Sequence, residues 1–201
     1  VVIAYPHPVG EVSARFHTSL LDLVRYDWVG AQLPDGKHVG GHQHIIGHMP
    51  LSSGANIVTA RNKIVKQFLD HPWGERPEWL WMIDADMTFD PDIVDRLLAA
   101  ADVKERPIVG GLCFALMRGE AQEVVPTVYG MSTQGSQLVR YSGYPPDQLV
   151  RVAGTGAACL LVHRRVFETI RDRRWTDADE AQWATEQDRP SGQSPGALMY
   201  P

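Results

Sequence analysis

The sequence contains only two cysteines, Cys113 and Cys159, in 201 residues. Both lie in apolar, strand-like runs, which is typical of buried thiols in a reducing compartment rather than of a disulfide. Two cysteines in such surroundings exclude a disulfide-rich secreted scaffold. We therefore expect two free thiols and a cytoplasmic protein.

Long hydrophobic runs and an excess of basic residues are also missing. The longest apolar stretches, such as residues 157–162, are far too short to cross a bilayer, so we expect no transmembrane segment. The net charge of −5 argues against a generally basic nucleic-acid surface, although a local patch could still hold an acceptor. The sequence has no signal peptide, and it opens at Val1 inside a strand-like run, which leaves open whether residues precede it.

The composition and the hydrophobic pattern are those of one α/β domain. A chain of 201 residues, 44% of them hydrophobic, is long enough to bury a sizeable core. Strand-like and helix-like segments alternate without an internal repeat. Strands are predicted at 1–5, 42–49, 79–83, 107–114, 124–129, 137–141, 149–152 and 157–162, a turn at 50–54, and helices at 13–26, 55–70, 91–101 and 164–173. From Trp175 onward there is no clear period, which predicts a loop or tail.

The most informative stretch is residues 79–92, WLWMIDADMTFDPD. Its first five residues are apolar, as in a strand buried on both faces of a sheet. Asp84 and Asp86 follow at the carboxyl edge, where open α/β sheets bind ligands, and Asp90 and Pro91 suit a helix N-cap and first helical position. The paired carboxylates suit Mg²⁺ or Mn²⁺ completed by substrate phosphates and water. The alternative is an acidic turn that caps the helix.

Arg61 lies in the middle of the apolar side of the predicted helix 55–70. An arginine aimed at the core normally needs a carboxylate or phosphate partner, because its charge is costly to desolvate alone. The alternative is an arginine whose stem packs while its head reaches water. Because this helix precedes the acidic strand, the pattern favours a functional arginine.

Two further groups of charged or metal-binding residues have simpler interpretations. His38, His42, His44 and His48 cluster in the sequence, but neither cysteine nor carboxylate joins them at zinc-like spacing, which favours loop and edge-strand histidines. The basic run within residues 164–174 is typical of a solvated helix face, with contact to an anionic acceptor or nucleic acid as the alternative.

The order of these motifs carries a family resemblance. Ala60-Arg61-Asn62 precedes Asp84-Ala85-Asp86, a Gly110-Gly111 strand follows, and Gly154-Thr155-Gly156 precedes the late strand and Cys159 to Arg165. Over residues 1–173 this order resembles GT-A-fold glycosyltransferases, most of all the family 2-like group of bacteria and phages. The resemblance implies a Rossmann-like three-layer α/β/α sandwich with a mostly parallel, mixed central sheet. It also implies a single domain with a nucleotide-sugar-binding half at 1–106, an acceptor-side half at 107–173 and an irregular tail at 174–201.

The same resemblance implies roles for individual residues. Asp84 would lie near the ribose or sugar and Asp86 would be a direct ligand of Mn²⁺ or Mg²⁺, so that both form the metal site. Arg61 would approach the nucleotide. The nucleotide-sugar-binding residues would be Pro6, Arg61, Asp84, Ala85 and Asp86, and the acceptor side would be lined by Gly154, Thr155 and Gly156.

The sequence also departs from the family pattern. The family's first strand usually ends in Pro-Thr-Tyr-Asn, of which only Pro6 is present here. No acidic residue of the kind that helps to read the base closes the second strand, so the pattern does not define which nucleotide would bind. The histidine that often completes the metal site is missing. No Glu-Asp motif follows Trp175 in the form that supplies the general base of inverting members. The catalytic base is therefore unassigned, with only weak candidates at Asp177, Asp179, Glu180, Glu186 and Asp188, and the chain is either truncated or divergent there.

The leading functional hypothesis is a metal-dependent glycosyltransferase that moves a sugar from a nucleotide-diphosphate sugar to an acceptor hydroxyl. A second is a haloacid-dehalogenase-like phosphatase, because Asp84-Ala85-Asp86-Met87-Thr88 also fits that superfamily's D-x-D-x-T nucleophile motif. A third is a GT-A-like domain that binds a nucleotide or a partner without turnover. The donor sugar, acceptor, stereochemical outcome and oligomeric state are not readable from the sequence.

Overall fold

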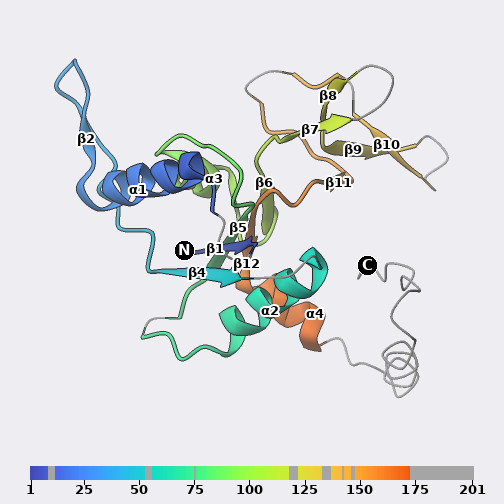
Figure 1. Ribbon diagram of the computed structural model, residues 1–201, viewed down its shortest axis with the longest axis horizontal. Helices are drawn as coiled ribbons and strands as arrows, with labels where there is room; N and C mark the ends of the chain where they lie inside the picture. The colour runs from blue at the N-terminus through green and yellow to red at the C-terminus, as the bar shows by residue number, and fades with distance from the viewer. Residues whose placement is uncertain are drawn as a thin grey trace. The chain divides into compact units, whose positions relative to one another are not determined.

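The computed structural model describes residues 1–8, 12–52, 56–74, 76–117, 122–132, 137–141, 143–145 and 148–172 (Figure 1). Residues Val1–Phe167 form one compact unit. A second unit, Glu168–Pro201, is described only as far as Asp172. The predicted irregular tail at 174–201 lies outside the described residues, and the predicted division into two halves after residue 106 stays a prediction.

A five-stranded mixed sheet forms the centre of the first unit. Its strands, in the order in which they pair, are β4 (Gly47–Ser52), β1 (Val2–His7), β5 (Trp79–Ile83), β12 (Cys159–His163) and β6 (Ile108–Gly110). β1 runs parallel to both β4 and β5, whereas β12 runs antiparallel to both β5 and β6. One reversed strand among parallel neighbours is the mostly parallel, mixed sheet that the sequence predicts.

The middle of this sheet is buried on both faces. All five residues of β5 are buried, and Trp81 and Leu80 are fully enclosed although they point to opposite faces. A strand covered on both sides has no polar face, which explains why its sequence is a continuous apolar run rather than an alternating one. The prediction of a doubly buried strand at 79–83 is confirmed.

Helices cover both faces of the sheet, so the unit has three layers (Figure 1). On one face, α1 (Ala14–Val29) and α3 (Ile93–Ala100) bury side chains such as Phe16 and Leu97 against Trp81. On the other face, α2 (Ile57–Asp70) and the start of α4 (Arg164–Asp172) pack Phe68 and Phe167 near Leu80. The predicted α/β/α layering is therefore present, with four helices among the described residues.

Short strands outside the central sheet form three small sheets. β2 (Ala31–Gln32) pairs with β3 (His38–Val39), and β7 (Phe114–Met117) pairs with β8 (Glu123–Pro126). β9 (Val128–Met131) pairs with both β10 (Leu138–Arg140) and β11 (Gly154–Thr155). All of these pairs are antiparallel.

Several predicted boundaries are wrong. The second strand is predicted at 42–49 with a turn at 50–54, but β4 continues through Pro50 to Ser52, which is possible because β4 is an edge strand. The predicted strand at 107–114 contains only three residues of β6, and 149–152 is not a strand. The helix expected after Asp90 begins two residues later, with Asp92 at its N-cap.

The first arginine of the basic run at 164–174 is not on a solvated face. Arg164 is buried, and its guanidinium donates from Nε to the Pro77 carbonyl at 2.8 Å and from Nη2 to the Phe68 carbonyl at 2.8 Å. It also lies 4.5 Å above the centre of the Phe68 ring. This cation satisfies carbonyl groups at the carboxyl end of α2, where the helix dipole favours positive charge.

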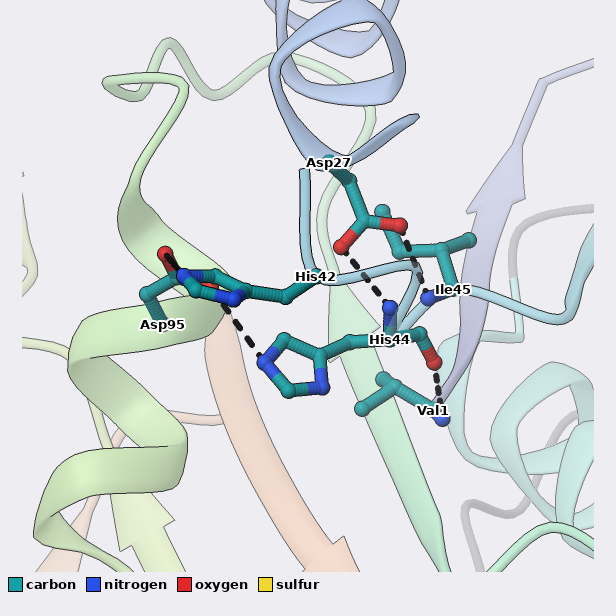
Figure 2. Close-up of polar contacts among 6 residues, drawn as sticks. All are labelled: Val1, Asp27, His42, His44, Ile45 and Asp95. Carbon is teal, nitrogen blue, oxygen red and sulfur yellow. Dashed lines mark hydrogen bonds and ion pairs between the residues drawn. The ribbon is translucent and has the colours of Figure 1, made fainter. Parts of the chain in front are cut away.

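A buried carboxylate joins α1 to the segment that leads into β4. Asp27 is 2% exposed and accepts hydrogen bonds from the backbone N–H groups of His44 at 2.9 Å and Ile45 at 3.0 Å (Figure 2). The carbonyl oxygen of His44 accepts a further hydrogen bond from the Val1 amino group at 2.6 Å. Asp27 therefore holds an irregular segment against the regular layers of the fold.

Candidate functional site

The turn that follows β5 lies at the carboxyl edge of the parallel strands. Asp84 donates its backbone N–H to the Ala158 carbonyl at 3.0 Å, and Met87 donates to the Asp84 carbonyl at 3.1 Å, which closes a tight turn around Ala85 and Asp86. The carboxylates are therefore where the sequence predicts them, at the edge where α/β sheets bind ligands. Asp84 is partly buried and Asp86 is exposed.

Arg61 pairs with the first of these carboxylates. Its Nη2 lies 2.7 Å from Oδ1 of Asp84 and donates a second hydrogen bond to the Ala157 carbonyl at 3.1 Å. Their side chains are 25% and 33% exposed, so the pair is neither fully buried nor a surface contact. Of the two partners that the sequence allows, a carboxylate or a phosphate, the structure shows a carboxylate, and a functional role for Arg61 stays a prediction.

Helix α2 holds Arg61 in this position. Asn56 is its N-cap, and the Asn56 side chain accepts a hydrogen bond from the Thr59 backbone N–H at 3.0 Å. Ile64 and Phe68 follow at helical spacing and are fully buried, which fixes the rotation of the helix. Both hydrogen bonds of Arg61 come from Nη2, and its Nε and Nη1 donate to no other group within the described residues. The guanidinium therefore keeps donors for a ligand.

An open cleft of about 610 Å³ lies beside the turn. Its size is within the range of small-molecule sites, and apolar residues form most of its wall. Among the described residues, the polar side chains that line it are Ser13, Asp84 and Asp86. The remaining lining residues are Pro6, Pro8, Val12, Ile57 and Ala85. Of the predicted nucleotide-sugar-binding residues, Pro6, Asp84, Ala85 and Asp86 thus share one cleft, with Arg61 bonded to its wall.

The residues predicted for an acceptor side lie elsewhere. Gly154 and Thr155 form β11, which pairs with Tyr129 and Val128 of β9. Gly156 donates its N–H to the Thr127 carbonyl at 2.7 Å, and a Cβ at this glycine would lie 2.7 Å from Oγ1 of Thr127. These contacts explain the glycine by packing, and none of the three residues lines the cleft. Their role toward an acceptor stays a prediction.

The expected metal site is not found in the part of the chain that the structure describes. No group of three or more histidine, cysteine, aspartate or glutamate side chains there could hold a metal ion. One oxygen of Asp84 is instead occupied by Arg61. The identification of Asp84-Ala85-Asp86 as a metal-binding D-x-D motif is corrected accordingly. A requirement for Mn²⁺ or Mg²⁺ stays a prediction from the sequence.

The four histidines are in loops and edge strands, as predicted: His38 lies in β3, His48 in β4, and His42 and His44 in the segment between them. The sequence gives no carboxylate partner for the last two, but Asp95 of α3 supplies one. Nε2 of His42 and Nε2 of His44 each lie 3.6 Å from an oxygen of Asp95 (Figure 2). Asp95 is far away in the sequence, so no spacing rule could have found it.

The weak candidates for a general base, Asp177, Asp179, Glu180, Glu186 and Asp188, lie outside the described residues. The structure adds residues that the sequence did not single out. Val12, Ser13 and Ile57 line the cleft, and Ile57 lies one helical turn before Arg61. Helical periodicity applied to Arg61 would have found Ile57, whereas Val12 and Ser13 are brought there only by the fold.

Comparisons with known proteins do not support the glycosyltransferase function that the sequence motifs indicate. No protein-family model matches the chain. A probable S-methyl-5'-thioinosine phosphorylase of Xanthomonas campestris pv. campestris is 27% identical over 103 residues, which cover 48% of this chain and 41% of that protein. The chain thus matches less than half the length of this curated relative. The crystal structure of A197 from STIV has 16% sequence identity and a TM-score of 0.47, covering 92% of this chain and 78% of that one. This structural similarity is too low to carry an argument.

The expectation of a family 2-like, nucleotide-sugar-dependent glycosyltransferase is therefore wrong. The curated relative is named as a probable phosphorylase and not as a nucleotide-sugar-dependent glycosyltransferase. The α/β layering is present, but the GT-A fold specifically is not confirmed. The comparisons equally give no support to a haloacid-dehalogenase-like phosphatase or to a nucleotide-binding GT-A-like domain. No helix within the described residues is long and apolar enough to span a membrane.

Proposed function

We propose that this chain is the nucleoside-binding part of a phosphorylase and that its cleft at the carboxyl edge of β1 and β5 binds the ribosyl group of the substrate. The observation that carries the proposal is the set of polar groups at this edge. Asp84 and Asp86 present carboxylate oxygens at the cleft, and Arg61 stands beside them with unused donors. The similarity to a probable S-methyl-5'-thioinosine phosphorylase makes purine nucleosides the substrate class to test.

The charges of the cleft favour a hydroxyl-rich ligand. Ionised carboxylates only accept hydrogen bonds, and the hydroxyls of a ribosyl group can donate to them. Asp86 is exposed and bonded to no other described residue through its side chain, so it is available to a ligand, whereas Asp84 shares its carboxylate with Arg61. Among the described residues, two carboxylates and one guanidinium give the site a net negative charge, which disfavours a free anion in the middle of the cleft.

Phosphate would therefore bind at the guanidinium. Arginine suits phosphate because its planar donors match two phosphate oxygens at once. In phosphorolysis a phosphate oxygen forms a bond to the anomeric carbon while the bond to the base nitrogen breaks. The electron pair leaves with the base, which then takes up a proton. The role of this chain's residues in that step is to bind and orient, with Asp86 and Arg61 holding the two reactants.

Thermal stabilisation tests the proposal directly, because a ligand that binds only the native state raises the apparent melting temperature. We expect S-methyl-5'-thioinosine and inosine to stabilise the protein, and phosphate to increase the effect. Ribose 5-phosphate separates recognition of the sugar from recognition of the whole nucleoside. A chain that no nucleoside stabilises, with or without phosphate, would contradict the proposal. Phosphate-dependent release of the base, followed by chromatography, then tests the reaction.

A further inference from the structure

A second cavity, of about 480 Å³, lies at the same edge of the sheet on the other side of β5. The first cleft lies between the ends of β1 and β5. This cavity lies where β5 and β6 end and where the antiparallel β12 begins. Ile83 at the end of β5, Leu112 after β6 and Cys159 at the start of β12 contribute to its wall. Nothing in the proposed function uses this space.

One wall of the cavity carries an aromatic ring in a fixed position. Phe89 lines the cavity and packs edge-to-face against two other rings. Its ring centre lies 5.2 Å from that of Trp81 and 5.9 Å from that of Phe16. Its backbone N–H also donates to Oγ of Ser19 at 3.3 Å. Rings packed in this way hold their orientation, so the cavity offers a preformed aromatic surface rather than a flexible one. Met87 and Ile93 add adaptable apolar surface beside it.

The described residues that line the cavity carry no unpaired charge. Cys113 and Cys159 both line it, and burial raises the pKa of each thiol, that of Cys113 to about 11. Cys159 also accepts a hydrogen bond from Nε1 of Trp81 at 3.4 Å. The charged residues that line it are Asp90 and Arg96, which are exposed and paired with each other at 3.1 Å. The cavity therefore suits neither a free anion nor a free cation.

The floor of the cavity depends on a glycine. Gly111 donates its N–H to the Cys159 carbonyl at 3.0 Å, and a Cβ at this position would lie 2.8 Å from Sγ of Cys159. Such a contact is shorter than van der Waals packing permits, so any other residue here would displace the thiol. The absence of a side chain at Gly111 lets the end of β6 approach the Cys159 side chain closely, and both sulfur atoms line the same cavity.

We propose that this second cavity binds an uncharged, planar heteroaromatic ring against Phe89. The cavity combines an aromatic surface, protonated thiols and an ion pair between Asp90 and Arg96. These features match a flat ring with a few polar atoms, and a purine base is the ring to test first. Binding of the ring stands on this geometry alone. That the ring is the base of the nucleoside substrate rests on the proposed function.

The two thiols give a direct readout, because they are the only cysteines in the sequence and both line the cavity. The rate at which iodoacetamide modifies them at high pH, where the thiols begin to ionise, is followed by intact mass and reports on occupation of the cavity without any substitution. With hypoxanthine or adenine at ten times the dissociation constant we expect labelling to slow by about tenfold, because only the free fraction reacts. Ribose 5-phosphate, which has no ring of this kind, should leave the labelling rate unchanged.

Two matched substitutions, one at a residue that lines the cavity and one outside it, test whether the ring binds in the cavity. Leu112 lines the cavity and Leu116, on β7, does not, although the two side chains are similarly exposed. Leu112→Trp should therefore block the cavity and abolish protection by the free base, whereas Leu116→Trp should keep it. Unchanged labelling of the wild type at saturating base, or full protection in Leu112→Trp, would overturn the proposal. If the base protects but no nucleoside binds, the ring site stands and the proposed function fails. If a nucleoside binds through Asp86 without protecting the thiols, the proposed function stands and the ring site fails.

Discussion

Arg61 Nη2 lies 2.7 Å from Oδ1 of Asp84, and this single contact joins the turn after β5, which lines the cleft, to helix α2. The same nitrogen reaches the Ala157 carbonyl, just before β12. One guanidinium therefore ties together three segments that are far apart in the sequence. Asp84 is held by this ion pair, whereas the exposed Asp86 makes no side-chain hydrogen bond or ion pair with another described residue and is the carboxylate that we propose binds the ligand.

Replacing Arg61 by Met should lower the free energy of unfolding by about 1–2 kcal/mol, because Asp84 and the Ala157 carbonyl lose their donor in a partly exposed setting. Urea denaturation measures the change. Lys63→Met, on the exposed side of the same helix, serves as the control and should change stability by less than about 0.5 kcal/mol. Equal effects of the two substitutions would show that the Arg61 contact does not stabilise the fold.

Asp27→Ala should be more costly, by about 2–4 kcal/mol, because it leaves the buried backbone N–H groups of His44 and Ile45 without an acceptor. Asp22→Ala, an exposed position on the same helix, controls for loss of a negative charge. The comparison is made by chemical denaturation of both variants. A loss of less than about 1 kcal/mol in Asp27→Ala would mean that water replaces the carboxylate.

Arg164 is buried on the side of the sheet that α2 covers. Arg164→Met should lower the free energy of unfolding by about 2–4 kcal/mol. The Pro77 and Phe68 carbonyls would lose their donors and the carboxyl end of α2 would lose its favourable charge. Arg25→Met, at an exposed position on α1, is the control for the loss of an arginine side chain. Amide hydrogen exchange should show faster opening of the last turn of α2 only in the first variant, and unchanged exchange there would contradict the assignment.

Cys113 should react slowly with thiol reagents and only at high pH. Its pKa is raised by burial to about 11, and a raised pKa means less thiolate at any given pH below it. At pH 8 a shift of this size lowers the thiolate fraction about a hundredfold relative to an ordinary cysteine. Between about pH 9 and pH 11 the native thiol keeps its proton while the thiol of the unfolded chain loses it. The contribution of the protonated Cys113 to the free energy of unfolding is therefore fully present below about pH 9 and is lost as the pH rises through about 11. Labelling rates that level off near pH 9 would contradict this.

The parts of the fold that follow from local sequence were predictable. A short continuous apolar run followed by a turn favours a strand covered on both faces, and β5 has the predicted bounds, Trp79–Ile83. The inward position of Arg61 followed from helical periodicity, and the need for a partner followed from the cost of burying its charge. In both cases the residues within one element contain all the information that is needed.

The parts that depend on contacts between distant segments were not predictable. Pro50 reads as a turn residue, and only its place on an edge strand makes it compatible with β4. Asp95 meets His42 and His44 because α3 packs beside their loop, and Arg164 is buried because α2 ends above it. The glycosyltransferase interpretation failed for a related reason. Carboxylates at the end of a sheet strand recur in many α/β proteins and do not by themselves define the reaction.

The most direct test of the account is calorimetric titration of S-methyl-5'-thioinosine into the wild-type chain and into Asp86→Asn, with Asp22→Asn as the control. The account predicts that the nucleoside binds the wild type and the control equally. It also predicts that Asp86→Asn weakens binding by about 10- to 100-fold, the value of one hydrogen bond to a charged group. No binding to the wild type, or equal binding to Asp86→Asn, would contradict a nucleoside site at the carboxyl edge of β5.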